Sequence, residues 1–240
     1  MAKLGSLAYW SFVAASSASL FWGAVVLWLL TVAFDRRLVL LHRYTCFWAS
    51  LYTWLNPLWR VEVIGREKID PSRTYVMVSN HLSLVDIFVL FRLFRHYKWV
   101  SKIENFRLPF IGWNMTLNRY IPLRRGDRNS VAQMFEACRK TLASGSSILM
   151  FPEGTRSRTG ELQAFKTGAF DLALGAKLPV LPIVLQGSQT ALPKKGFTIR
   201  RASIRVTVLD PVDVASYGPD DAERLSADVR ARYVEFLAQA

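Results

Sequence analysis

The first 34 residues of the chain contain the feature that most restricts what it can fold into. No charged residue occurs from Leu4 to Phe34, a run of 31 residues. A helix needs about 20 mostly apolar residues to cross a bilayer, so this run is long enough. A secretory signal peptide has a shorter apolar stretch, and a soluble helical hairpin rarely goes this far without a charge. We therefore expect a membrane-associated helix that either crosses the bilayer or dips into one leaflet.

The next segment, residues 36–60, also has a membrane-like composition. It interleaves arginines with large aromatic residues, as a helix lying at the lipid headgroup boundary does. These residues are Arg36, Arg37, Arg43, Trp48, Tyr52, Trp54 and Trp59. If the first helix crosses the bilayer, the three arginines outweigh Lys3 and keep the remainder on the cytoplasmic side. We expect residues 1–59 to form a membrane-anchoring helical hairpin.

Residues 60–240 alternate short apolar runs with longer amphipathic ones. The pattern predicts strands at 61–65, 74–79, 98–102, 146–151, 179–186 and 202–210. It predicts helices at 83–97, 129–145, 166–177 and 219–239. Such alternation indicates a single α/β domain, with a mixed, mostly parallel sheet covered by helices.

The charge of the chain indicates an anionic partner. It carries 31 Lys and Arg against 18 Asp and Glu, a formal charge of +13, which suits nucleic acid, an anionic membrane surface or an acidic substrate. None of the common nucleic-acid-binding motifs is present, so we expect a lipid or a soluble anion and no nucleic acid. The two cysteines, Cys46 and Cys138, lack metal-binding spacing and are interpreted as reduced thiols. We expect no metal and no cofactor.

Two polar loops follow predicted strands, at the edge of an α/β sheet where ligands bind. One holds Asn80 and His81, after the strand at 74–79. The other reads PEGTRSRTG, from residue 152 to residue 160, after the strand at 146–151. In the second loop Arg156 and Arg158 flank a turn, and two arginines can grip a phosphate in a fork. A solvated basic turn is the alternative.

Two interpretations of the first loop stay open. In one, Ser83 caps the following helix and Asp86 occupies the capping-box position three residues later, with His81 as an ordinary loop residue. In the other, Asp86 comes round the first helical turn and accepts a hydrogen bond from one imidazole nitrogen of His81. The second nitrogen then faces the loop as a base.

The chain offers no obvious nucleophile of its own. No serine of the G-x-S-x-G type occurs, and neither cysteine lies near a glycine turn. We therefore expect the substrate to bring the nucleophile, as an alcohol, and the transfer to be direct, without a covalent enzyme intermediate.

Four blocks together resemble the glycerophospholipid acyltransferase family, most of all its bacterial 1-acylglycerol-3-phosphate acyltransferases. The resemblance covers roughly residues 61–186. The first block is His-x4-Asp, from His81 to Asp86, and the third is FPEGTR, residues 151–156. The second, IPLRR, ends in an arginine best matched by Arg125, with Arg124 as the near alternative. It lacks the usual acidic residue before that arginine. The fourth is VLPIV, residues 180–184.

The resemblance implies a glycerol-3-phosphate acyltransferase-like fold and a reaction. His81 would remove the proton from the sn-2 hydroxyl of lysophosphatidate, and Asp86 would orient His81. The oxygen would attack the thioester of an acyl-carrier protein or of acyl-coenzyme A, which yields phosphatidate. Glu153 would hold the glycerol part, and Arg125 and Arg156 the phosphate. The implied substrate-binding set is Arg124, Arg125, Glu153, Gly154, Thr155 and Arg156.

The same resemblance implies that the protein is located at the bacterial inner membrane, with its catalytic domain on the cytoplasmic face. Eleven basic residues against three acidic ones occur from Arg92 to Lys140. Such a surface suits anionic membrane lipids, the acceptor phosphate and an acidic acyl carrier. An apolar groove for the acyl chain is expected near residues 105–113.

Lys102 and Lys166 each have two readings. Lys102 follows a predicted strand and stabilises the thioester oxyanion or attracts phosphate, or it is a surface lysine. Lys166 adds to the phosphate pocket or merely starts a helix. His42 and His96 have no carboxylate at helical spacing, and we expect structural roles for both.

Two rival functions remain at this point. The first is an acyltransferase of the same family with another acceptor, such as glycerol-3-phosphate, another lysophospholipid or a lyso-ornithine lipid. The second is a non-catalytic membrane protein that binds anionic lipid or nucleic acid through its basic surface.

Overall fold

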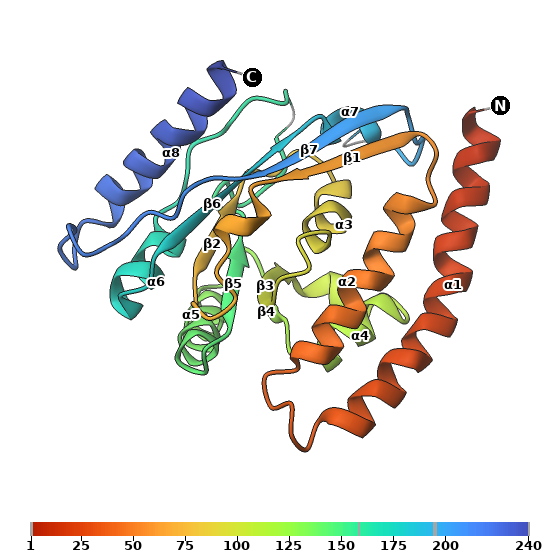
Figure 1. Ribbon diagram of the computed structural model, residues 1–240, viewed down its shortest axis with the longest axis horizontal. Coiled ribbons are helices and arrows are strands. Elements are labelled where there is room, and N and C mark those ends of the chain that lie inside the picture. The colour runs from red at the N-terminus through yellow and green to blue at the C-terminus, as the bar shows by residue number, and fades with distance from the viewer. Residues whose placement is uncertain (1, 158, 194–195, 240) are drawn as a thin grey trace.

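A computed structural model describes residues 2–157, 159–193 and 196–239 of the chain. Arg158, one of the two arginines that flank the turn, lies outside the described residues. The described part is built on a seven-stranded sheet in the order β1-β7-β6-β2-β5-β3-β4 (Figure 1). The strands are β1 (Trp59–Ile64), β2 (Val76–Ser79), β3 (Tyr97–Lys102), β4 (Ile121–Leu123), β5 (Ser147–Met150), β6 (Val180–Gln186) and β7 (Ala202–Val208).

Most neighbouring strands are parallel. β6, β2, β5, β3 and β4 run in one direction, while β7 pairs antiparallel with β6 and carries β1 parallel to itself. The carboxyl ends of five strands therefore meet at one edge of the sheet. A mixed, mostly parallel sheet covered by helices confirms the predicted fold class.

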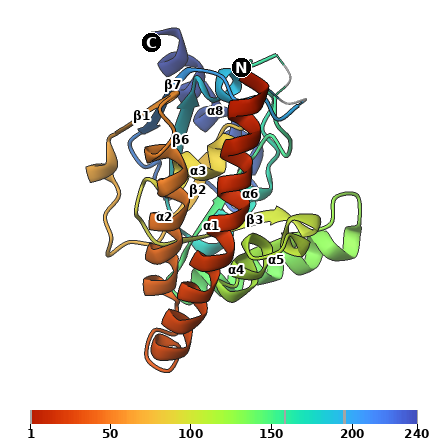
Figure 2. The ribbon, with the colours of Figure 1, turned by 90° about the vertical axis from the view of Figure 1, so that its right-hand side faces the viewer.

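Helices cover both faces of the sheet, as Figures 1 and 2 show. α2 and α3 pack on one face, α5, α6 and α8 pack on the other, and α1 lies outside α2. The helices are α1 (Ala2–Thr31), α2 (Val39–Trp54), α3 (Val85–Phe91), α4 (Ile111–Leu117), α5 (Arg128–Ala143), α6 (Gly168–Ala176), α7 (Ser188–Ala191) and α8 (Ala222–Ala238).

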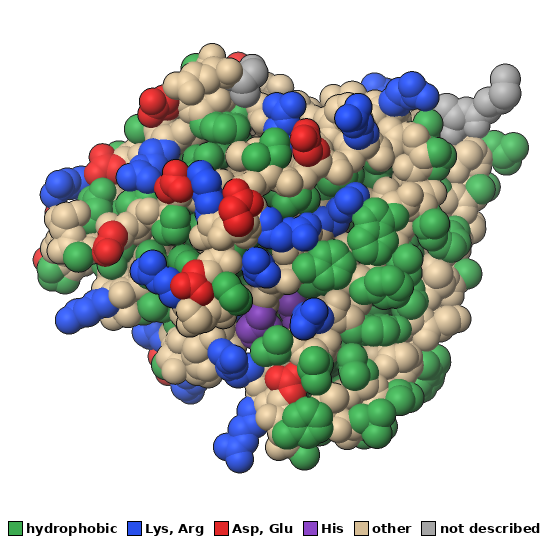
Figure 3. Space-filling model, viewed as in Figure 1, with side chains coloured by type: hydrophobic (Ala, Val, Ile, Leu, Met, Phe, Trp, Pro, Cys, Tyr) green, Lys and Arg blue, Asp and Glu red, His purple; other side chains and the backbone are tan. Residues whose placement is uncertain are grey.

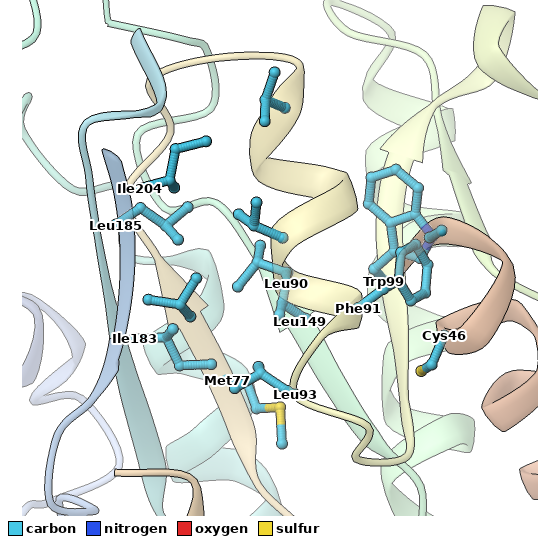
Figure 4. Packing of buried hydrophobic residues seen from close by; sticks show 14 of the residues in the cluster. Cys46, Met77, Leu90, Phe91, Leu93, Trp99, Leu149, Ile183, Leu185 and Ile204 are labelled. Atoms are coloured by element: carbon cyan, nitrogen blue, oxygen red, sulfur yellow. The ribbon is translucent and has the colours of Figure 1, made fainter. Parts of the chain in front are cut away.

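Strand β2 shows why the sequences of the central strands are apolar on both faces. All four of its residues are buried, because both faces are covered. Met77 points into the cluster under α3, whereas Val76 and Val78 point into the cluster under α5, α6 and α8. Figure 4 shows Leu90 of α3 beside Ile183 and Leu185 of β6. The sheet is thus held rigidly behind the loops at its carboxyl edge.

α1 has one protein-facing side and one open side. Val13, Phe21 and Ala24 are buried against α2 and α4, and Ser17 hydrogen-bonds the Tyr52 hydroxyl of α2 at 2.9 Å. The opposite side exposes Leu4, Leu7, Trp22, Val26, Leu29 and Leu30. The stretch Lys3–Thr31 is long and apolar enough to cross a membrane, by length and composition.

The structure corrects the roles of three aromatic residues in the expected headgroup-boundary helix at residues 36–60. The place of the helix at a membrane stays a prediction, because its outer side exposes Leu40, Phe47 and Leu55. Trp48, Tyr52 and Trp59 are buried, and only Trp54 among the four named aromatic residues is exposed. Trp48 and Tyr52 lie in the cluster between α1 and α2, and Trp59 packs in the main core. These rings therefore serve packing inside the protein and do not reach a lipid headgroup.

The predicted helix at 83–97 is also too long. α3 ends at Phe91, Phe94 adopts a left-handed backbone with φ of 50°, and β3 has begun by Tyr97. α4, α7 and the three-residue edge strand β4 were not predicted from the sequence. Elements this short carry too few residues for a periodic pattern.

Candidate active site

The two polar loops lie side by side because β2 and β5 are neighbours. Val76, Met77 and Val78 pair with residues 148–150, so both strands end at the same level. On the other side of β2, Asn80 extends the pairing of this strand with β6. Its amide accepts from Leu185 N at 2.7 Å and donates to Leu185 O at 2.9 Å. The residue before His81 is thereby fixed to the sheet.

His81 and Asp86 are hydrogen-bonded to each other. His81 Nδ1 lies 2.7 Å from Asp86 Oδ2, and Asp86 is fully buried, whereas the histidine side chain keeps 14% exposure. Since a carboxylate accepts hydrogen bonds, the pairing places the proton on Nδ1. Among the described residues no hydrogen bond reaches Nε2, so this nitrogen is available to a substrate.

Asp86 also satisfies the backbone of its own loop. Its Oδ2 accepts from Leu82 N at 2.7 Å and from Ser83 N at 2.8 Å. The two interpretations of Asp86 are therefore compatible, because one oxygen serves the helix entry and the imidazole together. The predicted Ser83 cap is confirmed in part. Ser83 Oγ accepts from Val85 N at 3.4 Å and also donates to Leu192 O at 2.9 Å, although the helix boundary itself falls at Leu84.

The imidazole is also held across its face. Phe151, the residue after β5, stacks on His81 with ring centroids 4.0 Å apart and an interplanar angle of 18°. A ring lying against another ring at this distance excludes water from one face and resists rotation about the side chain.

Glu153 joins the two loops. Its Oε1 accepts from His81 N at 2.7 Å, and its Oε2 accepts from Gln163 N at 3.2 Å and from Gln163 Nε2 at 2.9 Å. Ser157 N adds a bond to His81 O at 2.7 Å. Burial raises the pKa of the Glu153 carboxyl, although these donors oppose the shift. Contact of Glu153 with the glycerol part of a substrate stays a prediction.

The rest of the turn carries the cations. Gly154 has φ of 71°, and a Cβ at this position would lie 3.0 Å from Lys166 Nζ, so the lysine amine crosses the turn. Thr155 is exposed and its carbonyl accepts from Gln163 Nε2 at 3.2 Å. Arg156 is half-buried beside it. Arg156 and Lys166 thus lie in the segment after β5, which bonds the His81 loop through Glu153 and Ser157.

A family model described as Acyltransferase matches residues 60–186, more than half of the chain. The chain belongs to the acyltransferase family. The matched stretch contains both strand-end loops, with His81, Asp86, Phe151 and Glu153.

Curated relatives of this family member carry the name 1-acyl-sn-glycerol-3-phosphate acyltransferase. The protein of Chlamydomonas reinhardtii is 38% identical over 213 residues, which are 87% of this chain and 63% of that protein. The chloroplastic protein of Brassica napus is 35% identical, over 85% of this chain and 58% of its own length. This chain therefore spans about three fifths of the first two. The Limnanthes alba protein is 32% identical, over 90% of this chain and 76% of its own length.

A solved structure supports the fold. The crystal structure of the 1-acyl-sn-glycerophosphate acyltransferase PlsC from Thermotoga maritima superposes with a TM-score of 0.78. It covers 100% of this chain and 99% of its own, at 24% identity. At this identity the likeness bears on the fold alone.

Three predicted substrate residues of the acyltransferase lie farther along the same edge. Arg124 and Arg125 are exposed and follow β4, which is three strand spacings from β2, or about 14 Å. Lys102 ends β3, and its amine pairs with Glu104 at 3.3 Å where both side chains are about half exposed. Arg156 is nearer to His81 than these residues, because its neighbour Ser157 donates from its backbone N to His81 O. Their predicted roles stay predictions.

Three residues that contact the candidate site were not predicted from the sequence: Phe151 as the stacking partner of His81, Gln163 and Ser188. Ser188 Oγ donates to Asp86 Oδ1. It lies two residues after the end of β6, so the rule that polar residues after strands share one edge was sufficient to flag it as a neighbour of the site. Nothing in the sequence around Gln163 marks it out.

We predict that Glu153→Gln slows turnover about 10- to 100-fold, because a small displacement of His81 is enough for such a loss. Glutamine keeps one acceptor oxygen, but its NH2 group then faces either the His81 N–H or the Gln163 N–H groups, which need an acceptor. Glu161→Gln is the matched control, since Glu161 is an exposed carboxylate of the same loop. Steady-state rates of the two purified variants measure the effect. Equal rates in both would show that the His81–Glu153 contact is dispensable.

Proposed function

We propose that the protein is a 1-acylglycerol-3-phosphate acyltransferase, which transfers a fatty acyl group from a thioester to the sn-2 hydroxyl of lysophosphatidate. The single observation that carries the proposal is the His81–Asp86 pair, with Nε2 unbonded among the described residues, beside the Glu153–Arg156 turn. The names of the relatives support the choice of reaction.

The geometry suits direct transfer. His81 Nε2 takes the proton of the acceptor hydroxyl as the oxygen bonds to the thioester carbonyl carbon, which gives a tetrahedral intermediate. When the carbon–sulfur bond breaks, the sulfur leaves and takes the proton from His81. Asp86 holds Nδ1–H throughout and stabilises the imidazolium that forms between the two steps. A thioester has a good leaving group, so base catalysis and positioning are sufficient.

The acceptor phosphate is assigned to the turn after β5. Arg156 and Lys166 belong to this loop, and Arg125 and Arg124 lie farther along the same edge. A guanidinium binds phosphate through paired hydrogen bonds, which favours a phosphorylated acceptor. The donor is an acyl-carrier protein or acyl-coenzyme A, both of which are acidic and suit the net charge of +13.

We also propose that the protein is bound to the cell inner membrane through α1, with residues 60–240 on the cytoplasmic face. Figure 3 shows hydrophobic side chains gathered over α1 and its surroundings, and Phe197 and Trp113 extend the exposed apolar set. α1 packs along α2 and α4, so only one of its sides is open to lipid. A helix lying in one leaflet suits this packing better than a helix surrounded by lipid.

We predict that purified protein in detergent acylates lysophosphatidate and that His81→Ala and Asp86→Asn each lower the rate by about 10²-fold or more. The assay pairs matched acyl-carrier-protein and acyl-coenzyme A donors with lysophosphatidate, glycerol-3-phosphate and a lyso-ornithine lipid, and follows the products by mass spectrometry. His96→Ala is the control, because His96 bonds Ser146 at the amino end of β5, far from the site edge.

The outcome separates the rivals. Transfer to a different acceptor alone would change the assigned substrate and leave the chemistry in place. Folded wild-type protein that binds anionic vesicles and transfers nothing, with any donor, would establish the non-catalytic alternative.

We predict that Arg156→Ala raises the KM for lysophosphatidate about 10- to 100-fold, as the loss of a charged hydrogen bond does, and leaves the KM for the thioester unchanged. Arg125→Ala acts in the same direction. Arg139→Ala is the control, since Arg139 pairs with Glu136 on the exposed side of α5. Kinetics with each substrate varied in turn test both. An effect confined to the thioester would contradict the assigned phosphate contact.

We predict that Leu29→Glu combined with Leu30→Glu lowers the fraction of protein bound to anionic vesicles by about tenfold or more, because a charge within a membrane helix costs about 2.5–3.5 kcal/mol. Val234→Glu is the matched control, as Val234 is an exposed apolar residue of α8, away from α1. Co-sedimentation with vesicles gives the bound fraction. Unchanged binding of the double variant would remove this face of α1 from the membrane.

A further inference from the structure

The two oxygens of the Asp86 carboxylate have different partners. Oδ2 accepts from His81 Nδ1 and from two backbone N–H groups of the same loop. Oδ1 points the other way and accepts from Ser188 Oγ. Both Asp86 and Ser188 are fully buried, so water does not take the place of this donor.

The place of Ser188 is set by the sheet. It follows β6, which pairs with β2 on the side opposite β5. Gly187, directly before it, has φ of 81°, and a Cβ there would collide with the backbone oxygen of Ser203 on β7. Only glycine fits this close approach, and the turn it allows aims the serine side chain at Asp86.

The same segment makes a second contact with the His81 loop. Leu192, one residue after α7, accepts through its carbonyl from Ser83 Oγ at 2.9 Å. The segment from Gly187 to Leu192 therefore contacts the His81 loop at two points, Asp86 and Ser83.

We propose that Ser188 is a positioning residue for the transfer reaction: it fixes the plane of the Asp86 carboxylate and thereby the direction of the His81 ring. A buried carboxylate oxygen without a donor is costly, so without the hydroxyl the carboxylate turns to share its remaining donors. That rotation moves Oδ2 from Nδ1. Ser188 acts through Asp86 and does not touch the substrate, because its side chain has no exposure. The role rests on the proposed function of the His81–Asp86 pair.

The experiment compares Ser188→Ala with Ser188→Thr, which keeps a hydroxyl, and with Ser226→Ala, a buried serine of α8 on the other face of the sheet. Ser188→Ala is expected to lower kcat about 10- to 100-fold with both KM values within about twofold of wild type, since the loss of a hydrogen bond to a charged group has this size. Ser188→Thr is expected to retain most of the activity.

A double-mutant cycle separates positioning from general destabilisation. If Ser188 acts through Asp86, adding Ser188→Ala to Asp86→Asn lowers kcat no further. If the double variant loses kcat by the product of the two single losses, the proposal is overturned. It is also overturned if Ser188→Thr loses as much kcat as Ser188→Ala while its thermal unfolding is unchanged.

A spectroscopic readout needs no turnover. The Nδ1 proton of a carboxylate-bound histidine gives a proton NMR signal far downfield, identified here by its absence in His81→Ala. We expect Ser188→Ala to broaden or abolish it and Ser188→Thr to keep it. An unchanged signal in Ser188→Ala would refute the role of Ser188. Wild-type protein that shows the signal and transfers nothing would instead refute the proposed function.

Discussion

The negative charge of Asp86 sits where no solvent reaches it, and the surrounding structure is arranged to satisfy that charge. An uncompensated buried carboxylate would be too costly to keep, so each oxygen needs donors of fixed position. The donors come from the backbone after β2, from the imidazole of His81 and from the segment after β6. A site of this kind exists only when β2 and β6 lie side by side. The order of strands is therefore a condition for the chemistry as much as for the packing.

The third strand in this arrangement is β5, which lies on the other side of β2. Its loop reaches His81 through Phe151, Glu153 and Ser157, by ring stacking, by a carboxylate and by a backbone amide. Three loops that are distant in sequence thus behave as one body. Crossover helices on both faces make this possible, because they allow each parallel strand to be inserted between earlier ones.

The sequence predicts those features that depend on residues close together along the chain. Six of the seven described strands and the longer helices show in their apolar periods. The His81–Asp86 and Glu153–Arg156 pairs stand out because each lies within six residues. The place of Ser188 at this edge could be predicted, but its contact with Asp86 could not, since it joins residues 102 positions apart and requires the strand order. The burial of Trp48 and Tyr52 was also out of reach. An aromatic and basic helix has the same composition whether its rings face lipid or, as here, α1 and the core.

The first turns of α1 are tied to the segment that continues from α7. Ser6 Oγ accepts from Ile199 N at 2.9 Å, Trp10 Nε1 donates to Phe197 O at 2.8 Å, and Arg200 N returns to Ala191 O at 3.0 Å. α1 and the Asp86 carboxylate are thus joined through a few short links. In the proposed membrane-bound arrangement, the level of α1 in the lipid would set the height of the imidazole above the acyl chains, so that a lipid acceptor need rise from its leaflet only as far as its own glycerol.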